Sequence, residues 1–332
     1  MKRIYKEENV YDASVKRFDF IFANFERIYL SFSGGKDSGV MLNLILQYMK
    51  ERGIKRKIGI QILDNEANYE YSVQFMHRIL QANSEYLEIY WCCMPITLPC
   101  TVSAYEVNWQ CWGVADKPRW VRPMPTESYI VNINNHPFGD KFIENMNYDE
   151  FWDMFAEFYS QGKTTANLIG IRTQESLNRF RAIMNDRKET MKGMQWTKKN
   201  TEHVYNVYPI YDWRTRDIWI SNSKFEFDYN KLYDTFYLAG VPVERMRVAS
   251  PFMSESKSSL NLYRVIDGGV VALTLQLLTE NNLITILLRC LKATHGSHLL
   301  NSYWLHCQKN RQKILRRASF NPLSFGVEWG AD

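Results

Sequence analysis

One run of six residues near the N-terminus has the composition of an anion-binding loop. It reads SGGKDS and comprises Ser33, Gly34, Gly35, Lys36, Asp37 and Ser38. Adjacent glycines let the backbone approach a ligand closely, because no Cβ stands in the way. An apolar run precedes the loop and a helical apolar pattern follows it, so free amides and the positive end of a helix dipole face the same point. With two hydroxyls and one ammonium added, the loop predicts a site for phosphate or pyrophosphate.

This loop differs from the common P-loop, in which four residues separate the first glycine from the Gly-Lys pair. Here the glycines are adjacent and Asp37 follows the lysine. A chance glycine turn before a helix is the alternative, but six matched positions in a strand–turn–helix setting argue against it. In that setting SGGKDS resembles the PP-loop of the ATP pyrophosphatase superfamily. This superfamily includes phosphoadenosine phosphosulfate (PAPS) reductases, ATP sulfurylase small subunits, tRNA thiolases, and NAD and GMP synthetases.

A second polar segment, residues 170–179, follows a later apolar run and reads GIRTQESLNR. Arg172 and Arg179 can donate bidentate hydrogen bonds to phosphate or sulfate oxygens. Glu175 can hold an arginine in place or ligate a metal. The alternative is an ordinary helix start with surface charges. Beside the SGGKDS loop, the pattern G-I-R-x-x-E-S-x-x-R resembles the second motif of the PAPS reductase branch.

A third segment, residues 208–219, reads YPIYDWRTRDIW and resembles the sequence after the last core strand of that branch. Its Asp212 is expected to orient Arg172 or Arg179. For Trp213 and Trp219, packing in the core is as good an interpretation as a role in the site. The resemblance extends over residues 10–263. It points to the subgroup of PAPS reductase-like sulfurtransferases that includes the immunoglobulin-binding regulator proteins, which are encoded beside ParB-like partners.

Strands and helices alternate along the first part of the chain. This order predicts an α/β fold with a doubly wound, mostly parallel sheet. The resemblance implies the Rossmann-like variant known as adenine nucleotide alpha hydrolase-like. The expected strands are 28–32, 58–63, 88–93, 166–171 and 204–210. The expected helices are 10–25, 36–52, 69–80, 148–159, 175–187, 215–219 and 230–239.

Two regions interrupt this pattern. Residues from about 94 to 160 hold several prolines and tryptophans without a clear period, which predicts an insertion or lid. We expect residues 1–260 to form one nucleotide-binding domain around this insertion. The resemblance fails after about residue 265, so 261–332 is treated as a separate C-terminal part, helical in character and with a new basic cluster.

The composition is that of a soluble globular protein, with 45% hydrophobic and 23% charged residues in a chain of 332. A net charge of +5 permits an anionic ligand or nucleic acid without demanding either. The N-terminus lacks the apolar core of a secretory signal, and no apolar run is long enough to span a bilayer, so no membrane contact is expected. Six cysteines then predict reduced thiols and a cytoplasmic protein.

The cysteines also limit the chemistry. PAPS reductases act through a cysteine in an E-C-G-x-H context, and Cys307 lacks those neighbours, which makes assimilatory PAPS reduction doubtful. Paired C-x-x-C motifs are absent from the sequence, so neither an iron–sulfur cluster nor a zinc site is predicted. Cys93 and Cys111 are the candidates for a sulfur-carrying thiol.

The resemblance implies an enzyme that binds ATP or PAPS and catalyses adenylyl or sulfur transfer, with Lys36, Asp37 and Arg172 as catalytic residues. Mg²⁺ is expected at Asp37 or Asp64, because it favours one or two carboxylates plus phosphate oxygens. Two alternatives stay open. One is a nucleic-acid-linked sulfurtransferase in defence, and the other is a nucleotide-sensing regulator acting with a ParB-like partner. The expected nucleotide-binding residues are Ser33, Gly34, Gly35, Lys36, Asp37, Ser38, Asp64, Arg172, Glu175 and Arg179.

Overall fold

A single mixed sheet organises the described part of the chain, which in this computed structural model comprises residues 7–99, 108–238 and 240–248. The predicted C-terminal part 261–332, with its basic cluster and Cys307, lies outside these residues. The sheet has seven strands in the order β6-β3-β2-β1-β7-β9-β8. The strands are β1 (Arg27–Ser31), β2 (Ile58–Leu63), β3 (Leu87–Cys93), β6 (Ile130–Asn132), β7 (Thr165–Ile169), β8 (Thr197–Lys199) and β9 (Val204–Val207).

The connectivity confirms the predicted doubly wound α/β fold. All pairings in the sheet are parallel except that between β8 and β9 at one edge. From β1 in the middle, the chain proceeds outward through β2, β3 and β6. It then returns to the other side of β1 and adds β7 and β9. The direction of winding therefore reverses between β1 and β7.

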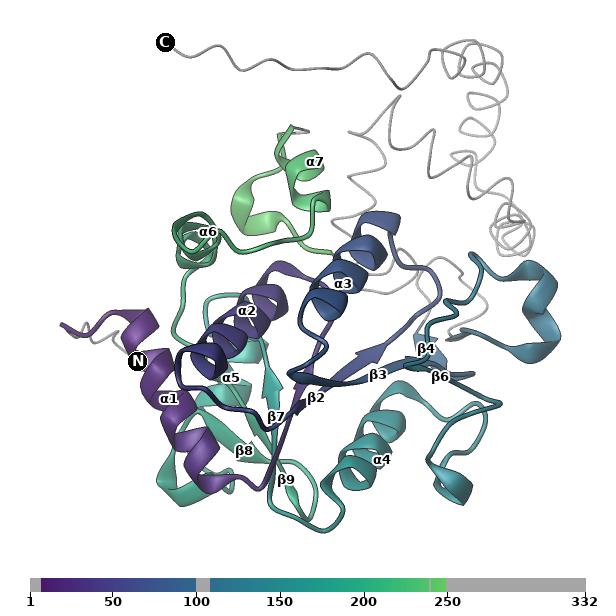
Figure 1. Ribbon diagram of the computed structural model, residues 1–332, viewed down its shortest axis with the longest axis horizontal. Helices are drawn as coiled ribbons and strands as arrows, with labels where there is room; N and C mark the ends of the chain where they lie inside the picture. The colour runs from purple at the N-terminus through teal and green to yellow at the C-terminus, as the bar shows by residue number, and fades with distance from the viewer. Residues whose placement is uncertain (1–6, 100–107, 239, 249–332) are drawn as a thin grey trace.

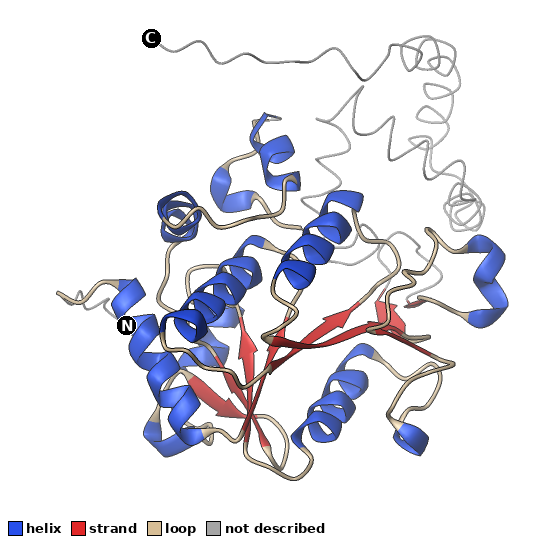
Figure 2. Ribbon diagram, in the orientation of Figure 1, coloured by secondary structure: helices blue, strands red, loops and turns tan. Residues whose placement is uncertain are grey.

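Helices cover both faces of the sheet, with α2 and α3 on one side and α4 on the other (Figures 1 and 2). Among the described residues, no helix combines the length and the apolar character needed to cross a membrane. The α-helices are α1 (Val10–Asn24), α2 (Lys36–Glu51), α3 (Glu70–Ala82), α4 (Tyr148–Ser160), α5 (Leu177–Met184), α6 (Thr215–Lys224) and α7 (Leu232–Leu238). The short 3₁₀ helices are η1 (Val114–Arg119), η2 (Gly139–Lys141), η3 (Met191–Gly193) and η4 (Val243–Arg245).

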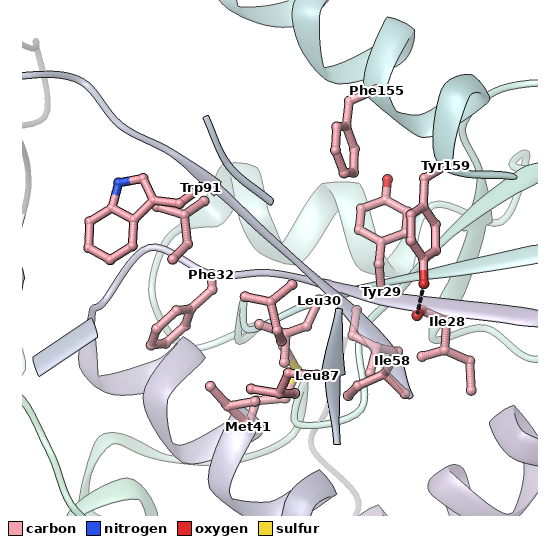
Figure 3. Packing of buried hydrophobic residues seen from close by; sticks show 14 of the residues in the cluster. Ile28, Tyr29, Leu30, Phe32, Met41, Ile58, Leu87, Trp91, Phe155 and Tyr159 are labelled. Atoms are coloured by element: carbon pink, nitrogen blue, oxygen red, sulfur yellow. Dashed lines mark hydrogen bonds between the residues drawn. The ribbon is translucent and has the colours of Figure 1, made fainter. Parts of the chain in front are cut away.

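Strand β1 is buried on both faces because its alternating side chains enter two separate packing layers. Leu30 lies on the side of Met41 from α2, as Figure 3 shows. Tyr29 projects to the opposite face, where its ring meets Phe155 and Tyr159 of α4 at centroid distances of 5.5 and 5.1 Å. This double burial fixes the position of β1 and hence of the loop that follows it.

The segment predicted as an insertion contributes to the main fold. Its β6 extends the sheet by pairing with β3, and its α4 covers one sheet face. Between β3 and β6 in the chain, β4 (Thr97–Pro99) and β5 (Asn108–Gln110) pair antiparallel in a separate two-stranded sheet. The predicted strand 204–210 ends early, at Val207, since Pro209 lacks the amide hydrogen that a sheet ladder needs.

Candidate functional site

The SGGKDS loop (residues 33–38) lies at the point where the sheet reverses its winding. It follows β1, while the polar segment 170–179 follows β7, and these two strands pair in parallel from Arg27↔Thr165 to Ser31↔Ile169. Parallel neighbours end at the same edge. In open α/β sheets, ligands bind in the crevice outside the carboxyl ends of the strands at such a switch point. The fold therefore brings together the first two motifs that the sequence singled out.

The loop backbone has the conformation that its glycines predict. Gly34 has a φ of +67°, in the left-handed region that favours glycine. Gly35 is extended and precedes α2, which begins at Lys36 without a side-chain cap among the described residues. The Ser33 and Ser38 hydroxyls lie 3.1 Å apart at the mouth of this turn. Backbone amides of the first helical turn thus point at the loop, as an anion site requires.

Gly170 lets the end of β7 approach the start of α2. A Cβ at this position would lie 2.9 Å from both the Cα and the backbone nitrogen of Ser38. These are backbone atoms at the start of a helix and cannot rotate away. The absence of a side chain at Gly170 therefore sets the distance between the two motifs.

We expect Gly170→Ala to lower the free energy of unfolding by about 1–3 kcal/mol, because the added Cβ overpacks the joint between β7 and α2. Gly39→Ala is the matched control. Its Cβ would meet the far end of the Phe75 ring at 3.2 Å, and alanine favours the helix. Urea unfolding followed by tryptophan fluorescence compares the two variants. Equal midpoints for wild type and Gly170→Ala would contradict the close approach.

Asp37 joins the two motifs through an ion-pair cluster. Its Oδ1 accepts a hydrogen bond from Nε of Arg172 at 2.6 Å, and its Oδ2 lies 3.2 Å from Nζ of Lys36. Arg172 is 1% exposed and also donates to the Trp213 carbonyl oxygen and to Thr215. Burial lowers the pKa of the Lys36 ammonium, which Asp37 opposes and Arg172 reinforces. The cluster is a buried, charged centre at the loop.

Glu175 and Arg179 extend this cluster along the start of α5. One Glu175 oxygen lies 3.5 Å from Nε of Arg172, and the other contacts the guanidinium of Arg179. Arg179 is the more exposed of the two arginines, with 39% of its side chain accessible. The Ser176 hydroxyl accepts from the Arg179 amide and caps α5, which explains why this helix begins later than predicted.

Asp212 does not orient either of these arginines, so that prediction is wrong. Its two carboxylate oxygens accept hydrogen bonds from Arg17 of α1 at 2.8 and 2.6 Å. Arg17 also donates to the carbonyl oxygen of Pro209. Trp213 is buried and donates through Nε1 to Ser14. This third motif attaches α1 to the region that follows β9, and its Trp213 carbonyl oxygen and Thr215 hydroxyl accept from Arg172.

Residues far along the chain cover the loop; the resemblance to the PAPS reductase branch reaches residues 229–234, but the sequence did not predict their contacts with the loop. The Tyr233 hydroxyl accepts from the Lys36 amide at 3.0 Å, and the Met246 carbonyl oxygen accepts from Lys36 Nζ at 3.0 Å. Asn230 donates to the Gly34 carbonyl oxygen at 3.0 Å. We call the described residues between 230 and 248 the C-terminal cap. Lys36 is only 6% exposed beneath it.

A small cavity of about 110 Å³ remains between the cap and the two motifs. It has room for a few water-sized groups, since a water molecule takes about 30 Å³ of the liquid. Arg247 of the cap enters its wall and donates to the Glu175 carbonyl oxygen at 2.7 Å. Three basic residues therefore line one cavity, together with two glutamates. The described lining is Lys36, Arg172, Gln174, Glu175, Thr215, Glu244 and Arg247.

Asp64 follows β2 at the same sheet edge but takes part in a different set of contacts. It is fully buried and accepts from Trp91 Nε1 at 2.6 Å, from Asn68 at 3.1 Å and from Arg122. The neighbouring Glu66 amide also donates to it at 2.8 Å. Arg122 comes from the segment predicted as an insertion, Trp91 from β3, and Asn68 and Glu66 from the β2–α3 connection. The structure thus groups Asp64 with that segment and not with the Lys36 cluster.

The two carboxylates predicted as Mg²⁺ ligands are held by other side chains. Both Asp37 oxygens face cations, and both Asp64 oxygens accept hydrogen bonds. Within residues 7–99, 108–238 and 240–248, no group of three or more His, Cys, Asp or Glu side chains is arranged to hold a metal. This donor set does not fit a resident Mg²⁺ ion.

The two candidate sulfur-carrying thiols are both buried. Cys111 donates to the Met94 and Ile96 carbonyl oxygens, and burial raises its pKa well above the ordinary range. Cys93 is 1% exposed, and burial likewise raises its pKa. Burial thus keeps both thiols protonated, whereas a reactive cysteine needs an accessible thiolate.

The fold is a doubly wound α/β fold, and part of the chain is similar to a PAPS reductase domain. Residues 120–239 match the phosphoadenosine phosphosulfate reductase domain, and residues 240–283 match a domain of unknown function (DUF3440). The first match contains Arg172 and Glu175, whereas Met246 and Arg247 of the cap fall in the second. The finer resemblance to the immunoglobulin-binding regulator proteins stays a prediction.

Among known proteins, the chain is 34% identical over 262 residues to the uncharacterized protein YbdN of Escherichia coli (strain K12). The match spans 78% of this chain but only 63% of that relative. Solved structures with a similar arrangement include a PAPS reductase from Candida auris in a phosphate complex, with 12% identity, a TM-score of 0.35, and 70% and 94% of the two chains covered. Another is the U34-tRNA thiolase NcsA from Methanococcus maripaludis, with 14% identity, a TM-score of 0.38, and 83% and 78% covered.

Proposed function

We propose that this protein binds an adenine nucleotide, ATP or PAPS, and catalyses adenylyl or sulfur transfer. The observation that carries the proposal is the convergence of Lys36, Arg172 and Arg247 on one cavity beside the start of α2. Basic side chains and helix amides at a switch point form a site for an anionic group. The match to the PAPS reductase domain supports the choice of an adenine nucleotide.

The residues of the cluster have distinct roles in this proposal. Lys36 and the first amides of α2 bind the phosphate or sulfate end. Asp37 holds Lys36 and Arg172 in place. When ATP is the substrate, an acceptor oxygen attacks the α-phosphorus, the bond to the β-phosphate oxygen breaks, and pyrophosphate leaves with its charge facing these donors. Such preorganised donors lower the barrier where the negative charge develops.

Replacing Lys36 tests the proposal directly. We expect Lys36→Ala to weaken ATP or PAPS binding by at least about tenfold, the value of one hydrogen bond to a charged group. Lys163→Ala, at an exposed turn before β7, is the control and should leave affinity unchanged. Isothermal titration with each nucleotide supplies the measurement, and circular dichroism checks folding. Unchanged affinity in Lys36→Ala would count against the proposal.

The C-terminal cap covers the SGGKDS loop, and this arrangement favours a second candidate function, a nucleotide-sensing regulator. A ligand reaching Lys36 must displace the Met246 carbonyl oxygen, and one reaching the first amide of α2 must displace the Tyr233 hydroxyl. Binding would therefore move the C-terminal cap, as a sensor requires. The resemblance noted from the sequence gives such a regulator a ParB-like partner.

Product analysis separates the two functions. Incubation with ATP and Mg²⁺, or with PAPS and a dithiol that supplies the two electrons for reduction to sulfite, is followed by assays for pyrophosphate, sulfite and adenosine 3′,5′-bisphosphate. Release of any of these, lost in Lys36→Ala, supports the transfer enzyme. Tight binding without release supports the sensor.

A further inference from the structure

A second and much larger cavity lies at the same edge of the sheet. Its volume is about 810 Å³, within the range of small-molecule sites, and it is open to solvent on one side. Cys93 and Asn132, the last residues of β3 and β6, form part of its floor. The other walls come from η1 and from the residues on either side of it, which supply two tryptophans, three prolines and one methionine: Trp112, Trp120, Pro118, Pro123, Pro125 and Met124.

The walls of this cavity are held by the two buried acids that follow β2. Glu66 accepts from the Trp112 amide at 2.6 Å and from the Val121 amide at 2.7 Å. The Asp64 carbonyl oxygen accepts from Trp112 Nε1 at 2.8 Å, and its carboxylate binds Arg122. Trp112 has a φ of +53°, a conformation that non-glycine residues rarely adopt without such support. These hydrogen bonds therefore fix the position of the aromatic wall before any ligand binds.

The chemistry of the lining selects for a planar and anionic ligand. The Trp112 and Trp120 rings meet edge to face at 5.1 Å, and Trp120 is only partly buried. The Lys117 ammonium lies 5.8 Å from the Trp120 ring centroid, and Arg122 lines the same space. None of the described lining residues is acidic. Aromatic faces beside basic groups bind nucleobases by stacking and phosphates by charge.

This cavity is separate from the Lys36 site but close to it. Strands β3 and β6 are two and three positions from β1 in the sheet, which corresponds to about 10 and about 14 Å. No described residue lines both cavities. The edge can therefore hold two ligands at once.

We propose that the aromatic cavity is a second nucleotide-binding site, in which a base stacks on the tryptophan wall and its phosphate meets Lys117 and Arg122. The nucleotide is either free or one unit of a single strand, since both present the same base and phosphate. This site goes beyond the nucleotide proposed at the SGGKDS loop and does not depend on it.

Titration of the full chain with uridine 5′-monophosphate and with a ten-nucleotide oligouridylate tests the proposal. Trp120→Leu should weaken binding of either probe by about tenfold, the value of one stacked base. Lys117→Ala should weaken it by about two- to fivefold, and less at high salt. Lys117 is exposed, so this variant keeps the fold even if Trp120→Leu does not. Lys141→Ala, at an exposed lysine outside the cavity, is the control and should bind as wild type does.

The outcomes separate this site from the loop site. Weaker binding of both probes with unchanged ATP affinity supports the proposal, even if Lys36→Ala were to leave ATP binding unaffected. Tighter binding of the oligouridylate identifies a strand as the source, and equal binding identifies a free nucleotide. The proposal is overturned if the wild type binds neither probe at millimolar concentration, or if neither variant alters binding. It is equally overturned if Trp120→Leu weakens ATP binding as much as it weakens probe binding.

Discussion

Arg172→Ala is expected to lower the free energy of unfolding by about 3–5 kcal/mol, because it removes the one guanidinium that Asp37 and Glu175 share within a largely buried ionic cluster. Arg172 lies within 2.6 Å of Asp37 and 3.5 Å of Glu175, and the Glu175 side chain is 4% exposed. Lys36 stays beside Asp37 and Arg179 beside Glu175, but each of these cations contacts only one of the two acids. Urea unfolding of the full chain, followed by tryptophan fluorescence, measures the loss.

A surface arginine and a double-mutant cycle provide the controls. Arg216→Ala removes an arginine with 73% of its side chain exposed, 3.8 Å from Asp217, and should cost less than about 1 kcal/mol. Asp37→Ala combined with Arg172→Ala should lose clearly less than the sum of the single changes, since the pair then disappears together. Additive losses, or a loss below 1 kcal/mol for Arg172→Ala, would show that the pair is not a buried ionic contact.

The central part of the fold could be predicted because its signals are local. The strand, glycine turn and helix around residues 28–51 each follow from periodicity and from the tolerance of glycine for positive φ. Strand β6, strand β8 and the β4–β5 pair were missed, because each strand has three residues and cannot show an alternating pattern. Their positions depend on tertiary pairing with longer strands.

The site was only partly predictable for a related reason. The grouping of Lys36 with Arg172 follows from the rule that parallel strands end at one edge. The contacts of Tyr233 and Met246 with Lys36 span 197 and 210 residues of sequence. Periodicity and turn residues report on neighbours in sequence, so they could not predict these contacts. For Asp64 the sequence predicted a contact that the structure does not show. It lies at a strand end, as expected, but its carboxylate forms an ion pair with Arg122, which comes from a segment without periodicity.

The stability of the wild type should fall as the pH rises from about 4.5 to about 7, owing to Glu66. This residue is 2% exposed, and burial raises its pKa from 4.5 to about 7, against the hydrogen bonds from the Val121 and Trp112 amides. Below pH 4.5 both the folded and the unfolded chain hold the proton. Between the two values only the folded chain holds it, so each rise in pH favours unfolding. The whole shift corresponds to about 3 kcal/mol.

Glu66→Gln removes this titration and should flatten the pH dependence over the same window. The amide keeps one acceptor oxygen where two backbone N–H groups donate, so the variant should be less stable than wild type at pH 4.5. The difference between the two proteins should then narrow toward pH 7, where wild-type Glu66 becomes ionised. Glu189→Gln, at an exposed glutamate beside Lys199, should leave the wild-type slope intact. Parallel curves for wild type and Glu66→Gln would exclude Glu66 as the titrating group, because only a residue that binds the proton in one state can give the slope.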